Sequence, residues 1–242
     1  MPNEFPEAEV FEINKIDLKN PIIFAGFVGA GLVGPISIEC MIEKLKMKEV
    51  GYMRSKYLPP STAFMRGRLQ HPFRFYSNKE GTVCAIICEI TLQMKGLYTI
   101  AGAILDWAMK KGSKEIVILD GVASNEHDNK AYCAAEEDLC RVMADKNIDI
   151  IPHGFITGIA GGILNECLIR EIKGIALLVK ANSIIPDPEA AATLIEAINR
   201  LYEMNIDTTE LKKEKERISA ELEELSQKYL QHKKEESSDM YM

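Results

Sequence analysis

Apolar residues along this chain alternate between short continuous runs and longer stretches with a helical repeat. The first such pair joins an apolar run that begins at Ile22 to a segment over residues 35–47. Pro35 stands in the first turn of that segment, where a helix tolerates proline. The apolar residues that follow have i, i+3, i+4 and i+7 spacing, which predicts an amphipathic helix after a buried strand; they are Ile38, Met41, Ile42 and Leu45.

The same alternation continues to about residue 201, and it predicts the order of the elements. We expect strands over 9–13, from 22, and over 49–54, 63–69, 73–77, 83–90, 115–120, 148–151 and 175–179. We expect helices over 35–47, 97–111, 133–146 and 158–170, and a last helix from Pro188 capped by Asp187. Segments 63–69, 73–77 and 83–90 read as a small antiparallel set. The alternation indicates a three-layer α/β domain, with helices on both faces of a mostly parallel sheet.

After residue 205 the pattern changes to a highly charged helical repeat. Its apolar positions, Leu211, Ile218, Leu222, Leu225 and Tyr229, are spaced 7, 4, 3 and 4, as in a coiled-coil seam, although Lys215 interrupts one position. We therefore divide the chain into an α/β domain (1–205), a charged helical arm (206–231) and a flexible tail (232–242), which has no periodicity. The predicted arm or oligomer contacts are Leu211, Ile218, Leu222 and Leu225.

Charge and composition exclude several classes of protein. A net charge of -7 argues against broad binding to nucleic acid, which needs a basic face. No apolar run reaches the roughly 18–20 residues that span a bilayer. The acidic start of the chain does not resemble a secretory signal, so we expect a cytoplasmic protein. The four histidines and six cysteines show no metal-ligand spacing, and the cysteines read as small buried hydrophobic residues.

The turn before the first helix contains a motif typical of dinucleotide-binding sites. Gly29, Gly31 and Gly34 match G-x-G-x-x-G between a strand and a helix, where a dinucleotide site would place a pyrophosphate. Such a site also needs an acidic residue at the end of the next strand, but Glu49 stands at its start and Arg54 nearer its end. The same glycines permit a tight turn and close packing of helix on strand. We favour packing over cofactor binding.

A second glycine cluster, over residues 154–162, opens the helix predicted at 158–170. It either cradles an anion through backbone N–H groups or lets the helix approach its neighbours at Gly161 and Gly162, and we favour the second reading. His153 stands beside this cluster without an evident catalytic partner in sequence. Polar residues also follow the strand at 115–120, where α/β enzymes place active sites, but they form no motif; they are Asp120, Asn125, Glu126 and His127.

The sequence ends in Met240-Tyr241-Met242, a hydrophobic residue, a tyrosine and one further residue. A terminal carboxylate beside an aromatic anchor is a device for docking into a pocket on another protein, because the pocket can recognise both groups. We therefore take Met240, Tyr241 and Met242 as the candidate partner-binding residues.

Three segments together resemble the proteasome assembly chaperone 2 family, and its archaeal members most. They are Gly26–Gly34, Gly154-Phe-Ile-Thr-Gly158-Ile-Ala-Gly161-Gly162-Ile-Leu, and Ile185-Pro186-Asp187-Pro188-Glu189-Ala-Ala. The resemblance covers roughly residues 9–205. It implies a fold similar to that of nucleoside phosphorylases, with no established enzymatic activity and no cofactor.

The resemblance also implies partners. It implies self-association, with a ring-like tetramer or pentamer as candidates, association with a related chaperone homologue, and ATP-independent assistance to proteasome assembly. In that family a hydrophobic-Tyr-any terminus docks between α-subunits of the 20S ring, and Met240, Tyr241 and Met242 match it. The alternative is a nucleotide- or phosphate-binding enzyme of nucleoside phosphorylase type that uses the glycine-rich loops.

Overall fold

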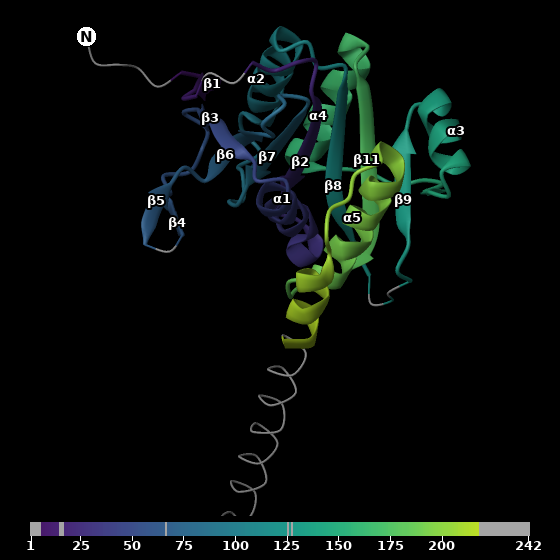
Figure 1. Cartoon of the computed structure of the whole chain (residues 1–242). Helices are drawn as coiled ribbons and strands as arrows, with labels where there is room; N and C mark the ends of the chain where they lie inside the picture. Colours follow the sequence, from purple (N-terminus) through teal and green to yellow (C-terminus); the bar gives the residue numbers. More distant parts are fainter. Residues whose placement is uncertain (1–5, 15–16, 66, 125, 127, 218–242) are drawn as a thin grey trace, which may run out of the picture.

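A nine-stranded sheet forms the centre of the computed structural model, which describes residues 6–14, 17–65, 67–124, 126 and 128–217. The strand order is β1-β3-β6-β7-β2-β8-β11-β9-β10 (Figure 1). Its strands are β1 Glu9–Glu12, β2 Ile22–Phe27, β3 Lys48–Arg54, β6 Phe73–Ser77, β7 Val83–Cys88, β8 Glu115–Ala123, β9 Ala131–Ala135, β10 Asp149–Ile150 and β11 Lys173–Ala181.

The middle of the sheet is parallel and its flanks are antiparallel. Strands β7, β2, β8 and β11 run in one direction, whereas β1, β3, β6 and β9 each pair antiparallel with a neighbour. Strand β2 lies between two parallel neighbours and is covered on both faces, which explains why its sequence is apolar without alternation.

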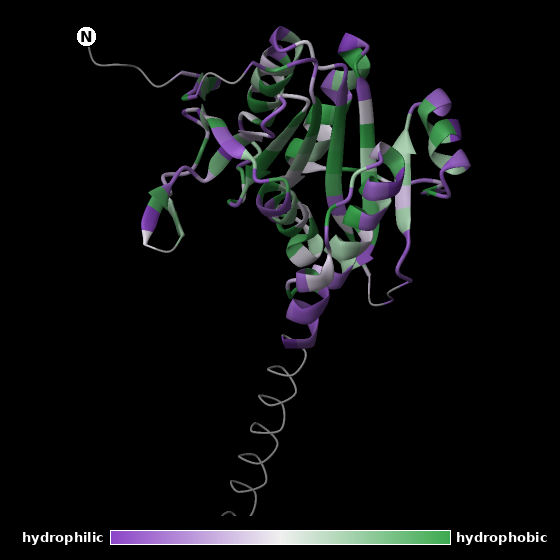
Figure 2. Ribbon diagram, viewed as in Figure 1, coloured by the Kyte–Doolittle hydropathy of each residue, from purple (hydrophilic) through white to green (hydrophobic). Residues whose placement is uncertain are grey.

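Two pairs of helices cover the faces of the sheet. Helices α1 (Val33–Lys44) and α5 (Pro188–Tyr202) lie on one face, and α2 (Leu97–Lys110) and α4 (Gly158–Arg170) lie on the other. The short α3 (Glu137–Asp145) lies beside β9 and β10. The predicted three-layer α/β fold is confirmed. Figure 2 shows the apolar strands enclosed between helices whose outer faces are polar.

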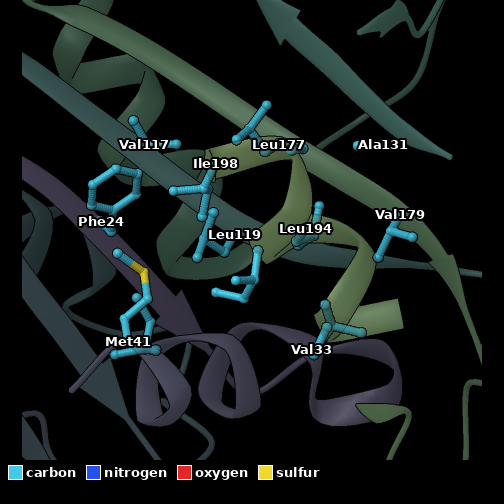
Figure 3. Packing of buried hydrophobic residues seen from close by; sticks show 14 of the residues in the cluster. Phe24, Val33, Met41, Val117, Leu119, Ala131, Leu177, Val179, Leu194 and Ile198 are labelled. Carbon is cyan, nitrogen blue, oxygen red and sulfur yellow. The ribbon is translucent and has the colours of Figure 1, made fainter. Parts of the chain in front are cut away.

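The core on the α1 and α5 side is built from aliphatic side chains of the central strands and of both helices. Phe24 and Leu119 point from the sheet toward Met41 of α1 and Leu194 of α5 (Figure 3), and all four side chains are fully buried. Helix α5 begins as predicted: Oδ1 of Asp187 accepts a hydrogen bond from the N–H of Ala190 at 3.1 Å, and Pro188 is the first helical residue.

Two predicted elements were wrong. The helix expected over 133–146 begins only at Glu137, because residues 131–135 form β9 and pair with the edge of β11, with Cys133 opposite Leu177. Of the expected antiparallel set, β6 and β7 do pair antiparallel, as part of the main sheet, but segment 63–69 does not join them. Segment 63–69 instead turns at Gly67 into a hairpin of β4 (Ala63–Met65) and β5 (Arg68–Gln70), which forms a small sheet of its own.

Candidate functional site

The three glycines of the G-x-G-x-x-G turn lie where the turn crosses the end of β8 and the start of α5. A Cβ on Gly29 would lie 2.4 Å from Oδ1 of Asp120, and one on Gly34 would lie 2.6 Å from the carbonyl oxygen of Leu119. Gly31 has a φ of +62°, and its carbonyl accepts a hydrogen bond from the N–H of Asp187 at 2.8 Å. The close packing expected of these glycines is confirmed.

The second glycine cluster also includes a close approach. A Cβ on Gly161 would lie 2.2 Å from the carbonyl oxygen of Ile156, while one on Gly162 would be in ordinary contact with Ala101 of α2, at 3.5 Å. Gly161 therefore lets the loop before α4 fold back on the helix, and Gly162 faces α2. Gly158 has a φ of +69° with no atom near its missing Cβ, so its requirement is conformational.

A cavity of about 970 Å³ opens where the carboxyl end of β8 meets α2 and α4. Asp120 and His153, which were separate candidate site residues in the sequence, both line this cavity. Asn125 and His127 lie outside the described residues, and Glu126 is exposed. Further polar and apolar residues complete the lining; they include Asn165, Thr157, Met94, Tyr98, Phe155 and Leu168.

Asp120 is the titratable group whose environment is most unusual in this cavity. Burial raises the pKa of its carboxyl to about 6, and the hydrogen bond from the N–H of Gly121 to Oδ1 at 2.8 Å opposes this shift. His153 is exposed. Within the described part of the chain no group of three or more His, Cys, Asp or Glu residues could hold a metal ion. The cavity thus offers one half-buried acid among polar and apolar lining residues.

The buried cysteines are not reactive nucleophiles at neutral pH. Five of the six are buried, as predicted, and Cys140 is half-buried. Burial raises the pKa of the Cys40 thiol to about 11 and that of Cys84, Cys88, Cys133 and Cys167 to about 12. These thiols stay protonated at neutral pH, and the thiolate is the reactive form.

The apolar rim of this cavity was not anticipated from the sequence. Phe155 is 99% exposed, Met94 is 84% exposed and Tyr98 is 64% exposed. Contiguous apolar surface on a protein marks sites of interaction more often than single exposed residues do. The sequence feature that could have indicated this rim is Phe155, a large aromatic residue in a loop flanked by glycines.

The start of the charged arm is fixed to the domain. Residues 209–217 are helical, and Leu211 is half-buried against the core formed by α1 and α5. Asn199 of α5 holds the connection, since its side chain donates to the carbonyl of Ile206 and accepts from the Ile206 N–H, both at 2.9 Å. Ion pairs then join the arm to α1 and α5, namely Lys44 with Glu210, Lys212 with Glu196 and Lys215 with Glu189.

The other predicted site residues lie beyond this anchored turn. Leu211 contacts its own domain in the structure. Ile218, Leu222 and Leu225 of the predicted seam lie outside the described residues, as do Met240, Tyr241 and Met242. No helix in the described residues is both long and apolar enough to cross a membrane.

The hairpin of β4 and β5 exposes two large apolar side chains. Phe64 is 77% exposed and Leu69 is 80% exposed, and the two are cross-strand partners. Figure 1 shows the hairpin standing off from the main sheet. The sequence pattern indicated a single strand here, so this surface was also missed.

Comparisons with known proteins place the chain among archaeal relatives. The profile of the family described as PAC2 matches residues 23–226. An uncharacterised protein of Methanocaldococcus jannaschii is 29% identical over 216 residues, which make up 89% of this chain and 90% of that protein.

Solved structures share the fold over nearly the whole chain. The crystal structure of Pyrococcus furiosus PbaA, described as an archaeal homolog of proteasome-assembly chaperone, has a TM-score of 0.86 and 25% identity, and the match covers 98% of this chain and all of that one. A protein of unknown function from Thermoplasma acidophilum has a TM-score of 0.78 and 30% identity, with 91% of each chain covered. Pyrococcus furiosus PbaB, described as an archaeal proteasome activator, has a TM-score of 0.82 at 23% identity over 91% of this chain and 99% of its own, a likeness of fold.

Proposed function

The chain belongs to the PAC2 family, and from that membership we propose that it is an ATP-independent scaffold of the proteasome assembly chaperone type. The observation that carries this proposal is the likeness to PbaA over 98% of this chain, at a TM-score of 0.86. In the proposed function the protein is not an enzyme. It forms a homo-oligomer and docks its C-terminal residues into 20S α-subunits.

The proposed docking residues are Met240, Tyr241 and Met242. Tyr241 offers a flat aromatic ring with a polar tip, Met240 adds an adaptable apolar side chain, and Met242 carries the terminal carboxylate. A pocket with a lysine would bind the carboxylate, while its apolar wall would receive the ring and Met240.

The anchored start of the arm supports this proposal by giving the tail a fixed origin. Helical residues 209–217 are held to α1 and α5. From Arg217 to Met242 the chain adds 25 residues (242 − 217), which in extended form reach at most about 80–90 Å. The tail can therefore reach a partner that does not touch the α/β domain.

A single tail would bind weakly, because ordering a segment on binding costs about 2–5 kcal/mol. An oligomer that presents several tails at the spacing of the pockets would bind much more firmly, since each later tail docks at a high effective concentration. The self-association and the tail are thus two parts of one proposed mechanism.

The test measures capture of recombinant proteasomal α-subunits by the full-length protein and its variants. Deletion of Met240–Met242, and Tyr241→Ala, should each abolish capture while oligomer mass and melting temperature stay unchanged. The control is Ser238→Ala, which changes a residue of the tail outside both the terminal motif and the seam and should leave capture intact. Adding one glycine after Met242 should also weaken capture, because it moves the carboxylate away from the tyrosine.

Unchanged capture by the truncated protein would remove the tail from the mechanism. The binding surface would then have to lie on the folded domain.

A further inference from the structure

We propose that the cavity between β8, α2 and α4 binds a small organic cation, namely an amine that carries a planar apolar body. The ammonium group would lie on the carboxylate of Asp120, and the body would lie against the rings of Tyr98 and Phe155. This inference goes beyond the proposed function, which rests on the C-terminal residues and assigns no ligand to the folded domain.

The cavity has the size and the position of a ligand site. Its volume of about 970 Å³ falls within the range of about 300–1,000 Å³ that small-molecule pockets occupy. Strand β8 is one of the parallel strands at the middle of the sheet, and open α/β sheets bind ligands beyond the carboxyl ends of such strands. Helices and a strand supply much of the lining, so the walls are held in place by the fold.

The charge of the cavity favours a cation. Asp120 is the acidic residue of the lining, and no lysine or arginine is among the described residues that line the cavity. Burial and the Gly121 hydrogen bond account for the pKa of Asp120, about 6, and no described cation contributes to it. The carboxyl is therefore ionised at neutral pH. A buried carboxylate without a cationic partner is costly, and an ammonium group would supply a charge-assisted hydrogen bond.

The carboxyl of Asp120 is held in position from two sides. The N–H of Gly121 donates to Oδ1 at 2.8 Å. The turn before α1 leaves room for the same oxygen, because a Cβ on Gly29 would lie only 2.4 Å from it. A group that is already fixed loses little conformational freedom when a ligand binds, and this preorganisation favours binding.

The rim of the cavity suits a planar apolar body next to the positive charge. Phe155 is 99% exposed and Tyr98 is 64% exposed, and both rings border the cavity. Aromatic rings stack with planar groups and attract cations through their faces. Met94, which is 84% exposed, adds an adaptable apolar side chain to the same rim. A ligand of this kind would cover apolar surface that the chain leaves open.

One feature of the cavity favours an anion instead. Helix α4 begins at Gly158, which lines the cavity, and the N-terminus of a helix carries about half a positive charge. The carboxylate of Asp120 carries a full negative charge and outweighs that half charge. A phosphate group would also find no lysine or arginine among the described lining residues. The balance therefore favours an amine over a nucleotide.

The experiment compares three probes that share one apolar body and differ in charge. They are 2-phenylethylamine, the neutral 2-phenylethanol and the anionic 3-phenylpropanoate. Each is titrated into the full-length protein at neutral pH, and binding is followed by ligand-observed NMR. The amine should bind at least about tenfold more tightly than the alcohol, because a hydrogen bond to a charged group is worth about that factor or more. The propanoate should bind most weakly.

Three variants assign the roles of the residues. Asp120→Asn should reduce the preference for the amine over the alcohol to about one, since it removes the charge and keeps the size of the side chain. Its urea unfolding curve verifies that the domain is folded. Phe155→Ala should weaken binding of the amine and of the alcohol. Asp145→Asn is the matched control, because this exposed carboxylate at the end of α3 lies outside the cavity, and it should bind as wild type does.

Several results would overturn the proposal. Equal affinities of wild type for the amine and the alcohol would do so, as would the absence of amine binding up to about 10 mM. Tightest binding of the propanoate would show an anion site at the start of α4 instead. A preference for the amine that persists in Asp120→Asn would place the ammonium group elsewhere. None of these measurements depends on the capture of α-subunits, so the proposed function is tested separately.

Discussion

Gly31 shows how strongly a single position can be constrained by its neighbours. Its φ of +62° is left-handed, and a Cβ there would lie 2.8 Å from Cβ of Asp187 and 3.1 Å from Cβ of Ala181. A side chain in the left-handed region costs about 1–2 kcal/mol before any contact is counted. The backbone and the space around it both require glycine here.

We predict that Gly31→Ala lowers the free energy of unfolding by at least about 1–2 kcal/mol, measured from urea unfolding curves. Gly154→Ala is the control, because Gly154 has no atom within 4 Å of its missing Cβ and no left-handed φ. It should change the unfolding midpoint little. A dinucleotide that copurifies with wild type and is lost in Gly31→Ala would contradict the packing interpretation.

Asp120 makes the stability of the domain depend on pH. Its pKa is about 6 in the folded chain, against about 3.9 for an unfolded aspartate. Between these values the folded state binds more protons than the unfolded state, so the free energy of unfolding falls as pH rises from about 4 to about 6.

We predict that Asp120→Asn removes this fall, because asparagine does not ionise and can still accept the Gly121 hydrogen bond. Relative to wild type, the variant should gain about 2 kcal/mol of stability between pH 4 and pH 7. Chemical unfolding at a series of pH values checks this. Parallel curves for the two proteins would show that the carboxyl is solvated in the folded chain.

At the scale of elements, the arm is the segment whose role the sequence most clearly suggests. Ile218, Leu222 and Leu225 continue the apolar spacing that begins at Leu211, and Leu211 already contacts the core. An isolated helix of this length is marginal in water, so the seam requires a partner surface. We predict that replacing these three residues with lysine changes the oligomer mass or increases hydrogen exchange over 208–230, while the α/β domain stays folded.

The matched control places lysine one position further along the arm, at Ser219, Glu223 and Ser226, and so adds charge off the seam. It should leave oligomer mass and exchange as in wild type. Equal behaviour of the two triple variants would show that the seam has no special role.

Sequence periodicity predicted those elements whose apolar residues repeat along one face and pack on the sheet. All five residues selected on α2 are buried, as are Ile38 and Met41 of α1. Strand β9 was missed because Ala131-Tyr-Cys-Ala-Ala135 has high helix propensity, and it becomes a strand only through pairing with β11. The shared cavity was missed for a similar reason, since only the folded chain brings Asp120 and His153 together.

At the scale of the whole molecule, three exposed features lie at different places on the same domain. The hairpin projects beside β3 and β6, the cavity opens at the end of β8, and the arm leaves below α1 and α5. The rigid sheet fixes the distances between them.

The position of β2 at the centre of the sheet also has a consequence for synthesis. β2 is entirely apolar, and its neighbours are β7 and β8, with Gly26 opposite Leu119. After Phe27 the ribosome must add 92 residues (119 − 27) to reach Leu119, which at about 5–20 residues per second takes about 5–18 seconds. During that interval the edge of β2 that β8 will occupy has no partner strand and can pair with another chain.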